Sequence, residues 1–592
     1  MGRQETIGFI LIFVVLMVWM WVQSPTPPPP QTQSHQELIN DSVRVKQQQT
    51  PVEKKTDAEK PSTSHFFATR TSGEEKVLIL ETDLFKAEIT TKGGLIRKWE
   101  LKKYKTWNGE PVQLVDFDSG GDYSLLFATT DGKLVNTRDL YFDARYAKWQ
   151  RVSLTGEQEY EISFVLPSSR GGNITKTYRF KNGKYGFDTE YAFSGLSGVI
   201  ANFEYQVVWE NGLRYAEENS VDESTFAAAY VHTGGELIEV DAVHGTDRTQ
   251  KDMAGTVDWV ATRNKYFGVA IIPTPGESDG AFIEGKSSNL PERGVFESYS
   301  VAVKIPYKGE AQEKRRFTVF LGPLDYGILK EHDRNLESIM SLGWVWIVRP
   351  ISVYVMLPLL SFLHSFIANW GLVIIVFSLI IKVVLHPLTK SSMKAMKKMQ
   401  SLQPMMNEMR EKYKDDPAKM NKAIMNLYKE YGVNPAGGCL PLLLQFPILI
   451  ALYNVFRAAI ELRQSSFFWW IDDLSIPDTL VSLPFELPLF GMKNISGLAL
   501  LMGITMFIQQ KMTIKDPRQK MMVWLMPIMM TLLFNAFPSG LNLYYFVFNL
   551  LSIGQQMLMN RQPDEPPRKV EKKRDKGGIF GKVTKDLPRF RK

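Results

Sequence analysis

One charged side chain, Lys382, lies inside a long apolar segment of the sequence, residues 371–387. Ser378 and His386 stand four residues before and after it, so on a helix the three share one face. Lys390 marks the end of the segment, and at ~1.5 Å per residue Lys382 lies roughly 12 Å from that end. A charge at such a depth costs several kcal/mol and usually faces water. The pattern favours a hydrated cavity over a lysine whose stem reaches the lipid headgroups.

A second group of polar side chains lies in the last apolar segment, residues 541–559. Its members, spaced by three and four residues along one helical face, are Asn542, Tyr545, Asn549, Ser552 and Gln556. Gln445, in segment 439–456, lies roughly 16 Å from Asn434, a depth similar to that of Lys382. Polar residues also join helices within lipid. Five in register, with a Lys and a Gln at matching depth, favour a hydrophilic groove lined by the second, third and sixth spans.

Enzyme and metal signatures are missing from the sequence. It contains no GxSxG, HExxH or Walker pattern. The single cysteine, Cys439, excludes an intramolecular disulfide and a cysteine-based metal cluster. We therefore expect a protein that is not an enzyme, with no catalytic residue, no metal site, no cofactor and no small-molecule substrate.

The polar residues of the groove must be positioned by helices that cross the bilayer. Six segments approach the ~17–25 residues that a membrane span requires. The first belongs to an uncleaved anchor at residues 1–23, and the others are 371–387, 439–456, 495–510, 521–537 and 541–559. The stretch 343–369 contains Arg349 and two prolines, and its apolar residues form one stripe. That stripe consists of Ile351, Val355, Leu359, Phe362 and Phe366. We predict a helix that lies in the membrane interface there, within a connecting region 323–369.

The loop charges predict the topology. Loop 390–432 has ten Lys/Arg against five acids, and loop 461–494 has two against five. The tail 561–592 has twelve Lys/Arg against five acids, and this excess of seven positive charges equals the net charge of the whole chain, +7. The positive-inside rule then places both termini in the cytoplasm and residues 24–369 largely outside it. The tail is either a solvated determinant of this topology or an arm that seeks RNA or lipid.

The regions outside the spans differ in amino-acid composition and in the pattern of apolar residues. Residues 24–74 are rich in Pro and Gln and predict a disordered linker. Short β-branched and aromatic runs with Gly-rich turns predict a large all-β domain over 75–322. Loop 390–432 predicts a helical hairpin, with Asp415 or Asp416 capping its second helix. A flexible apolar stripe beside lysines suits contacts with varied apolar sequences. Its contact residues are Met393, Met396, Met399, Lys397 and Lys398.

Three stretches resemble the YidC family of bacterial membrane protein insertases: NWGLVIIVFSLIIKVVLHPLTK (369–390), NPAGGCLPLLLQFPILIALYNVF (434–456) and FPSGLNLYYFVFN (537–549). The resemblance covers residues 340–560 closely, including the five-span core 370–560, and implies a Gram-negative member with a periplasmic β-supersandwich. It implies that Lys382, where the family usually has Arg, lies in a groove that receives polar parts of substrates. Gln445, Tyr544 and Tyr545 match groove or substrate-contact positions.

The resemblance also implies a multi-pass protein of the cell inner membrane that acts as an insertase and chaperone. The implied partners are nascent membrane proteins, the ribosome, the Sec translocon (SecYEG and SecDF) and the lipid bilayer. The alternative is a secondary transporter or channel with Lys382 as its coupling site. Such transporters usually contain internal repeats, and none is visible in the sequence. An intramembrane protease is less favoured still, because the spans contain no Ser–His or paired Asp motif.

Overall fold

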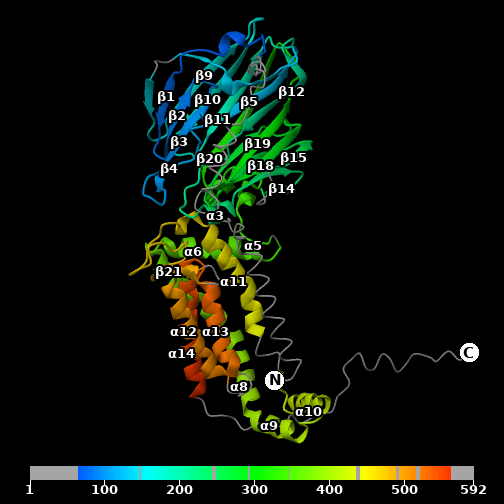
Figure 1. Cartoon of the computed structure of the whole chain (residues 1–592), viewed down its shortest axis with the longest axis vertical. Helices are drawn as coiled ribbons and strands as arrows, with labels where there is room; N and C mark the ends of the chain where they lie inside the picture. The colour runs from blue at the N-terminus through cyan, green and yellow to red at the C-terminus, as the bar shows by residue number, and fades with distance from the viewer. Residues whose placement is uncertain are drawn as a thin grey trace, which may run out of the picture. The chain divides into compact units, whose positions relative to one another are not determined.

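The computed structural model describes residues 64–145, 149–242, 248–290, 294–344, 346–434, 440–487, 492–514 and 520–561. It divides into two compact units, one formed by Trp21–Ser341 and one by Leu342–Lys592 with Met1–Met20 (Figure 1). Each unit is described by itself. The predicted anchor 1–23, residues 24–63 of the predicted linker and the tail beyond Arg561 lie outside the described residues.

The first unit is built from three β-sheets. The five-stranded sheet has the order β4-β3-β2-β1-β8, with β1 (Val77–Glu81), β2 (Phe85–Thr90), β3 (Ile96–Lys105), β4 (Pro111–Gln113) and β8 (Trp149–Ser153). The six-stranded sheet has the order β15-β18-β19-β12-β5-β6, with β5 (Ser124–Thr129), β6 (Leu134–Asn136), β12 (Ile200–Trp209), β15 (Thr249–Ala254), β18 (Gly280–Leu290) and β19 (Gly294–Pro306).

The largest sheet has nine strands in the order β14-β13-β16-β17-β20-β11-β10-β9-β7. These are β7 (Asp143–Ala144), β9 (Glu159–Pro167), β10 (Asn173–Lys181), β11 (Phe187–Ser194), β13 (Ala228–Thr233), β14 (Glu236–Val240), β16 (Trp259–Arg263), β17 (Phe267–Pro273) and β20 (Gln312–Pro323). Short helices lie between or after strands: η1 (Ala68–Arg70), η2 (Thr137–Asp139), α3 (Ser220–Ser224), α4 (Tyr326–Lys330) and η4 (Leu336–Ile339). The strand pairs are antiparallel except β1 with β8.

The core of this unit is aromatic, which explains the β-rich texture of its sequence. Strand β19 alternates buried and partly buried residues, as expected for a strand with one face on the core. Trp99, Trp209 and Trp259 are fully buried. Polar groups are buried too. Glu297 of β19 accepts a hydrogen bond from the Tyr299 hydroxyl at 2.7 Å, and burial raises the pKa of its carboxyl group to about 7.

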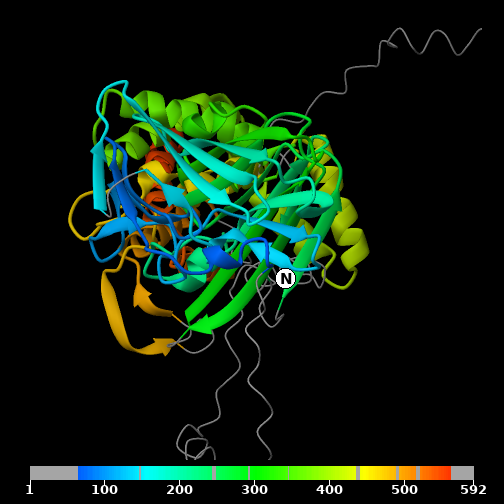
Figure 2. The same ribbon diagram turned by 90° about the horizontal axis from the view of Figure 1, so that it is seen from above.

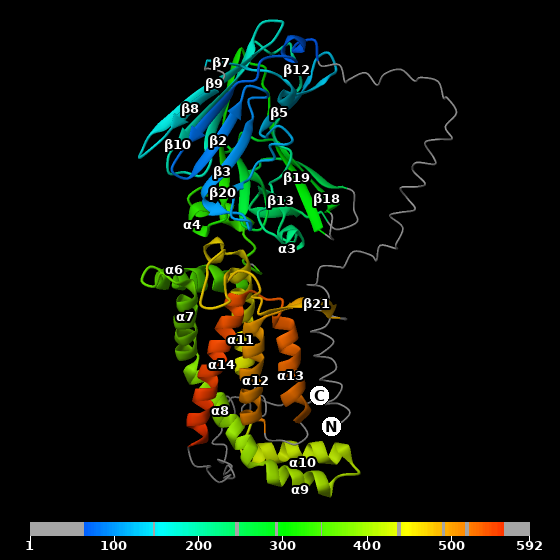
Figure 3. The same cartoon turned by 60° about the vertical axis from the view of Figure 1, so that its left-hand side comes forward.

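The second unit is mainly helical (Figure 3). Its longer helices are α7 (Trp370–Val384), α8 (His386–Ser401), α9 (Gln403–Lys412), α10 (Pro417–Glu430), α11 (Leu440–Ala458), α12 (Gly497–Thr513), α13 (Lys520–Phe534) and α14 (Ser539–Asn560). Helix α14 packs between α7 and α12, and α13 packs on α12. Gly503 of α12 permits the last contact, because a Cβ there would collide with the Thr531 hydroxyl. Helices α11 and α13 each contain an interior proline, Pro447 and Pro527.

The stretch predicted as an interfacial helix consists of three consecutive helical pieces. They are α5 (Val348–Ile351), the π-helical η5 (Ser352–Met356) and α6 (Leu357–His364). Val353, Met356 and Leu360 are buried against the protein, whereas Phe362 and Phe366 of the predicted stripe are exposed. The stripe therefore lies largely on the side that the protein leaves uncovered.

The predicted hairpin over 390–432 is present as helices, and its first part differs from the expectation of one helix. Helix α8 ends at Ser401 and α9 begins at Gln403, with Pro404 in the first turn of α9. Proline has no backbone N–H and cannot continue the hydrogen bonds of the preceding helix. Helix α10 is capped by Asp416, whose side chain accepts from the Lys419 N–H at 3.0 Å. The hairpin has its own small core of Leu402, Met406, Leu427 and Val433.

Length and hydropathy qualify no single helix in the described ranges as a membrane span by itself. One bent pair, Trp370–Val384 with His386–Ser401 at 61°, qualifies when taken together. The six spans and the positions of both termini accordingly stay predictions.

A β-hairpin in the second unit was not predicted. Strands β21 (Val481–Leu487) and β22 (Met492–Ile495) pair antiparallel, after the short helix η7 (Ile460–Leu462) and immediately before α12. Figure 2 shows the hairpin in orange, standing clear of the neighbouring helices. The buried Asp478 fixes its base by accepting from the Ser496 hydroxyl at 2.5 Å and the Leu498 N–H at 3.1 Å.

Candidate functional site

Lys382 lies near the end of α7, a helix that begins where the Asn369 side chain accepts from the Leu372 N–H at 3.1 Å. The lysine is 8% exposed. Its Nζ donates to Ser552 Oγ at 2.6 Å and lies 4.5 Å from the centre of the Phe548 ring. Both partners belong to α14. An ammonium group is thus held between two helices by one hydroxyl and one ring face.

No carboxylate pairs with Lys382 among the residues that the structure describes. A buried charge without a counter-ion is costly, since hydroxyl and ring contacts only partly replace the water it has lost. The site therefore favours the approach of a negative or strongly polar group.

The other two residues of the predicted Lys382 face differ from each other. Ser378 is fully buried, and its hydroxyl donates to the Ile374 carbonyl at 2.7 Å. His386 lies beyond the bend between α7 and α8 and is exposed, with Nδ1 3.3 Å from Gln555 Nε2. The face is therefore interrupted, because the helix axis changes direction between Lys382 and His386.

The predicted polar face of α14 divides into two environments. At its start, Asn542 is fully buried and its Nδ2 donates to the Phe534 carbonyl at 3.1 Å, which ties α14 to the end of α13. Further along, Asn549 is also buried, and its Nδ2 lacks a hydrogen-bond partner in the described part of the chain. Ser552 follows one turn later and meets Lys382. Asn542 thus serves the packing of helices, whereas Ser552 contacts the ammonium group and the buried Asn549 precedes it by one turn of α14.

Helix α11 contributes Gln445, whose side chain hydrogen-bonds that of Tyr545. Tyr544 is fully buried beside Phe377, with ring centres 6.1 Å apart. Its hydroxyl has no partner among the described residues. Side chains of α7, α11 and α14, the predicted second, third and sixth spans, are therefore in contact through Lys382 with Ser552 and Gln445 with Tyr545.

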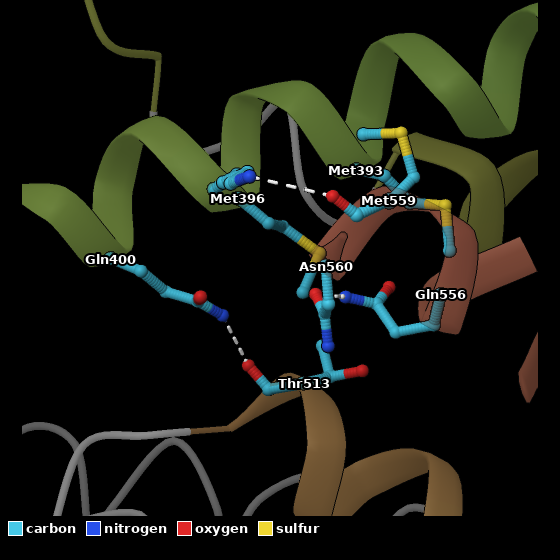
Figure 4. Close-up of a pocket in the computed structure, with 8 residues that line it drawn as sticks. Met393, Met396, Gln400, Thr513, Gln556, Met559 and Asn560 are labelled. Atoms are coloured by element: carbon cyan, nitrogen blue, oxygen red, sulfur yellow. Dashed lines mark hydrogen bonds between the residues drawn. The ribbon is translucent and has the colours of Figure 1, made fainter. Parts of the chain in front are cut away.

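The predicted hairpin contacts are only partly gathered in one place. Met393, Met396 and Lys397 of α8 line a shallow pocket with Gln556 and Met559 of α14. Figure 4 shows Met393 and Met396 beside Met559. The other two predicted residues lie elsewhere. Met399 packs on the core of the hairpin, and Lys398 is exposed.

Two hydrogen bonds at this pocket attach α8 to the C-terminal ends of α12 and α14. Gln400 Nε2 donates to the Thr513 carbonyl at 2.5 Å, at the end of α12 (Figure 4). Lys397 Nζ donates to the Met559 carbonyl at 3.4 Å. The last carbonyls of a helix lack partners within it and attract donors and positive charge. Gln400 and Phe548 were not predicted from the sequence, although Phe548 lies one turn before Ser552 and was detectable by spacing.

No group of His, Cys, Asp and Glu suited to holding a metal ion occurs in the described ranges. The contacts at this site are hydrogen bonds and a ring contact between helices. Comparison with known proteins decides what kind of protein carries it.

A family model described as the YidC periplasmic domain matches residues 78–354, and one described as the 60Kd inner membrane protein matches residues 362–566. The membrane protein insertase YidC of Chloroherpeton thalassium is 39% identical over 576 residues, covering 96% of this chain and 97% of that protein. The chain belongs to the YidC family of membrane protein insertases. The YidC of Chlorobaculum parvum is 41% identical over 499 residues, covering 83% of this chain and 84% of that protein.

Among solved structures, an active YidC insertase with its first transmembrane domain resolved is 20% identical and covers 83% of this chain and 93% of that one, with a TM-score of 0.35. Membership of the YidC family confirms three predictions. The protein is an insertase rather than a transporter or an enzyme, the β unit is the periplasmic domain, and the chain is an inner-membrane protein.

Proposed function

We propose that this YidC family member inserts nascent membrane proteins by offering them the polar surface around Lys382. The observation that carries the proposal is the buried ammonium group, which has a hydroxyl and a ring as partners and no carboxylate among the described residues. A polar or acidic segment placed there exchanges water for a charge and a set of hydroxyl and amide groups. The cost of moving it partway across the bilayer falls accordingly.

The proposed topology has six spans with both termini in the cytoplasm and the hairpin 390–432 on the cytoplasmic side. Loop charges support it through the positive-inside rule. Lys382 then lies nearer the cytoplasmic end of its span, where a polar segment arrives.

The proposed chaperone role is release of apolar helices into lipid beside the third and fifth spans. Its support is the uncovered apolar surface of these helices. Phe446 of α11 and Trp524 and Ile528 of α13 are all more than half exposed. In a bilayer such faces contact lipid tails or another apolar helix equally well.

The hairpin would meet emerging chains and ribosomal RNA. Its lysines suit phosphate groups, and Lys398 is exposed. The thioether side chains of Met393 and Met396 adapt to many apolar sequences. The ribosome, SecYEG and SecDF are proposed partners on this reasoning and on the family resemblance.

The test measures insertion of one single-span client with an acidic translocated tail into vesicles that carry Lys382 variants. Lys382→Arg keeps the charge and should retain insertion. Lys382→Ala and Lys382→Glu should reduce it by about tenfold or more, which corresponds to loss of ~1.4 kcal/mol of favourable interaction. Lys511→Ala, at an exposed lysine near the end of α12, is the matched control and should leave insertion unchanged.

A client with a neutral tail separates charge attraction from general damage, because it should depend on Lys382 much less. Equal insertion of the acidic client by all Lys382 variants would contradict the proposed role of the charge. A failure of Lys382→Arg as complete as that of Lys382→Ala would point instead to a residue that must release its proton.

A further inference from the structure

The β21–β22 hairpin carries apolar side chains that the protein leaves partly or largely uncovered. Val481 of β21 pairs with Ile495 of β22, and the next residue, Ser482, pairs with Asn494. Side chains alternate along a strand, so these two pairs lie on opposite faces. Beyond Ser482 the register is irregular as far as the pair of Leu487 with Met492. Val481 and the half-buried Ile495 share one face, since directly paired residues do so. Val481 is 50% exposed and Phe485 58% exposed. Val481 and Ile495, together with the exposed Phe485 further along β21, are called the apolar face of the hairpin.

The opposite face is polar. Ser482 of β21 pairs with Asn494 of β22, and both are exposed. A two-stranded hairpin alone is marginally stable in water, and an apolar face in water makes it less so. Such a two-sided strand pair is stable where apolar and aqueous surroundings meet.

The base of the hairpin is firmly held, so the position of the face is fixed. The Ser496 N–H donates to Asn535 Oδ1 at 2.8 Å, and Asn535 Nδ2 donates to the Asn494 carbonyl at 2.8 Å. Trp470 Nε1 donates to the buried carboxylate of Asp478 at 2.8 Å. These bonds join the end of β22 to α13, α12 and the segment before the hairpin.

Connectivity places the hairpin at the membrane boundary. Ser496 is the one residue between β22 and α12. The uncovered face of α12 consists of Leu500, Ile504 and Ile508, each one turn after the last, and all are exposed. In an inner-membrane protein such a stripe contacts lipid, so the apolar surface begins about one helical turn (~5 Å) beyond the hairpin.

A tryptophan at the same end supports this level. Trp469 is 86% exposed. It lies eleven residues before Leu480, whose N–H donates to the Ile495 carbonyl just before β21 begins. Leu480 itself is 46% exposed. Tryptophan is enriched where membrane and water meet, because its ring is apolar and its N–H is polar.

We infer that the β21–β22 hairpin is a membrane-surface arm whose apolar face lies in the headgroup region of the lipid bilayer beside the start of α12. The polar face with Ser482 and Asn494 points to water. The arm displaces lipid headgroups next to the helix bundle, at the boundary opposite the end where α8 meets α12. The inference depends on the membrane location of the family and not on the role of Lys382.

The experiment uses the single cysteine of the chain. Cys439→Ala removes it, and Phe485→Cys or Ser482→Cys introduces a nitroxide label on the apolar or the polar face. The full chain is reconstituted in vesicles of zwitterionic and anionic phospholipid. Accessibility of the label to oxygen, which partitions into lipid, is compared with accessibility to a water-soluble nickel complex. Each labelled protein is first checked for insertion of a client, so that misfolded variants are set aside.

The label at residue 485 should favour oxygen and report a depth of about 5–10 Å into the boundary between headgroups and acyl chains, as for other interfacial elements. The label at residue 482 should favour the nickel complex. Val481→Cys and Asn494→Cys form a second matched pair, with the same expected contrast.

Nickel accessibility at both faces would overturn the inference. So would an apolar face that becomes shielded only when a client is added, because its occupant would then be polypeptide. Loss of insertion in Lys382 variants with an unchanged depth at residue 485 would separate a failure of the proposed groove from a failure of the arm.

Discussion

Replacing Lys382 with methionine should leave the protein at least as stable while reducing insertion. The ammonium group gains ~1.5–3 kcal/mol from its hydrogen bond to Ser552. Its position over the Phe548 ring adds about 2 kcal/mol. Removing the same group from water costs several kcal/mol, so gain and cost nearly cancel. Methionine has a similar length and no charge, and we expect the free energy of unfolding to change by roughly 0 to +2 kcal/mol.

Ser552→Ala provides the matched measurement. In the wild-type background it leaves the ammonium group without its hydroxyl partner and should lower the free energy of unfolding by about 1–3 kcal/mol. In the Lys382→Met background it should be nearly neutral, since the hydroxyl then bonds only the Phe548 carbonyl of its own helix. Thermal unfolding in lipid nanodiscs of the four proteins gives the coupling energy. A loss of more than about 2 kcal/mol in Lys382→Met would refute the reasoning, because the charge would then be a net stabiliser.

Three further changes test the packing and the electrostatics. Gly503→Val should lower the thermal midpoint by forcing α12 and α13 apart, at a cost of about 1–3 kcal/mol, whereas Gly554→Val, where a Cβ meets open space, should not. Glu297 has its pKa raised to about 7, so its contribution to stability is complete below its ordinary value of 4.5 and is lost as pH rises through 7. Unfolding of the periplasmic domain followed against pH should therefore show falling stability over this window, and Glu297→Gln should flatten it. Ser496→Ala should destabilise the first turn of α12 by about 1 kcal/mol, seen as faster amide exchange at Ala499, whose N–H donates to the Ser496 hydroxyl at 3.0 Å, and no change in the β domain.

Local spacing predicted the parts of the site that one helix defines. The contact between Lys382 and Ser552 was foreseeable as a meeting of two polar helical faces, and the cap at Asp416 followed from the proline after it. Asn542 has the same spacing, yet its partner is the carbonyl of Phe534, the last residue of α13. Only the closed turn between α13 and α14 brings that carbonyl near, so spacing alone could not distinguish packing from groove.

The β21–β22 hairpin was missed for a physical reason. Pro484 interrupts the run V-S-L-P-F, and a proline argues against a strand in the middle of a sheet. Pro484 lies in the stretch where the pairing of β21 with β22 is irregular, so its missing N–H breaks no regular hydrogen bond between the strands. The break between α8 and α9 shows the converse, since Pro404 was present in the predicted helix and its effect on the chain was underestimated.

The interior prolines of α11 and α13 give this bundle an uneven stiffness. A proline leaves the carbonyl four residues earlier without its helical donor, so bending there breaks no hydrogen bond. Helices α7 and α12 have no such weak point within their described ranges, and α14 is wedged between them. When a substrate helix pushes against the bundle, α11 and α13 would therefore bend at Pro447 and Pro527. Helices α7, α12 and α14, which hold Lys382, would keep their positions.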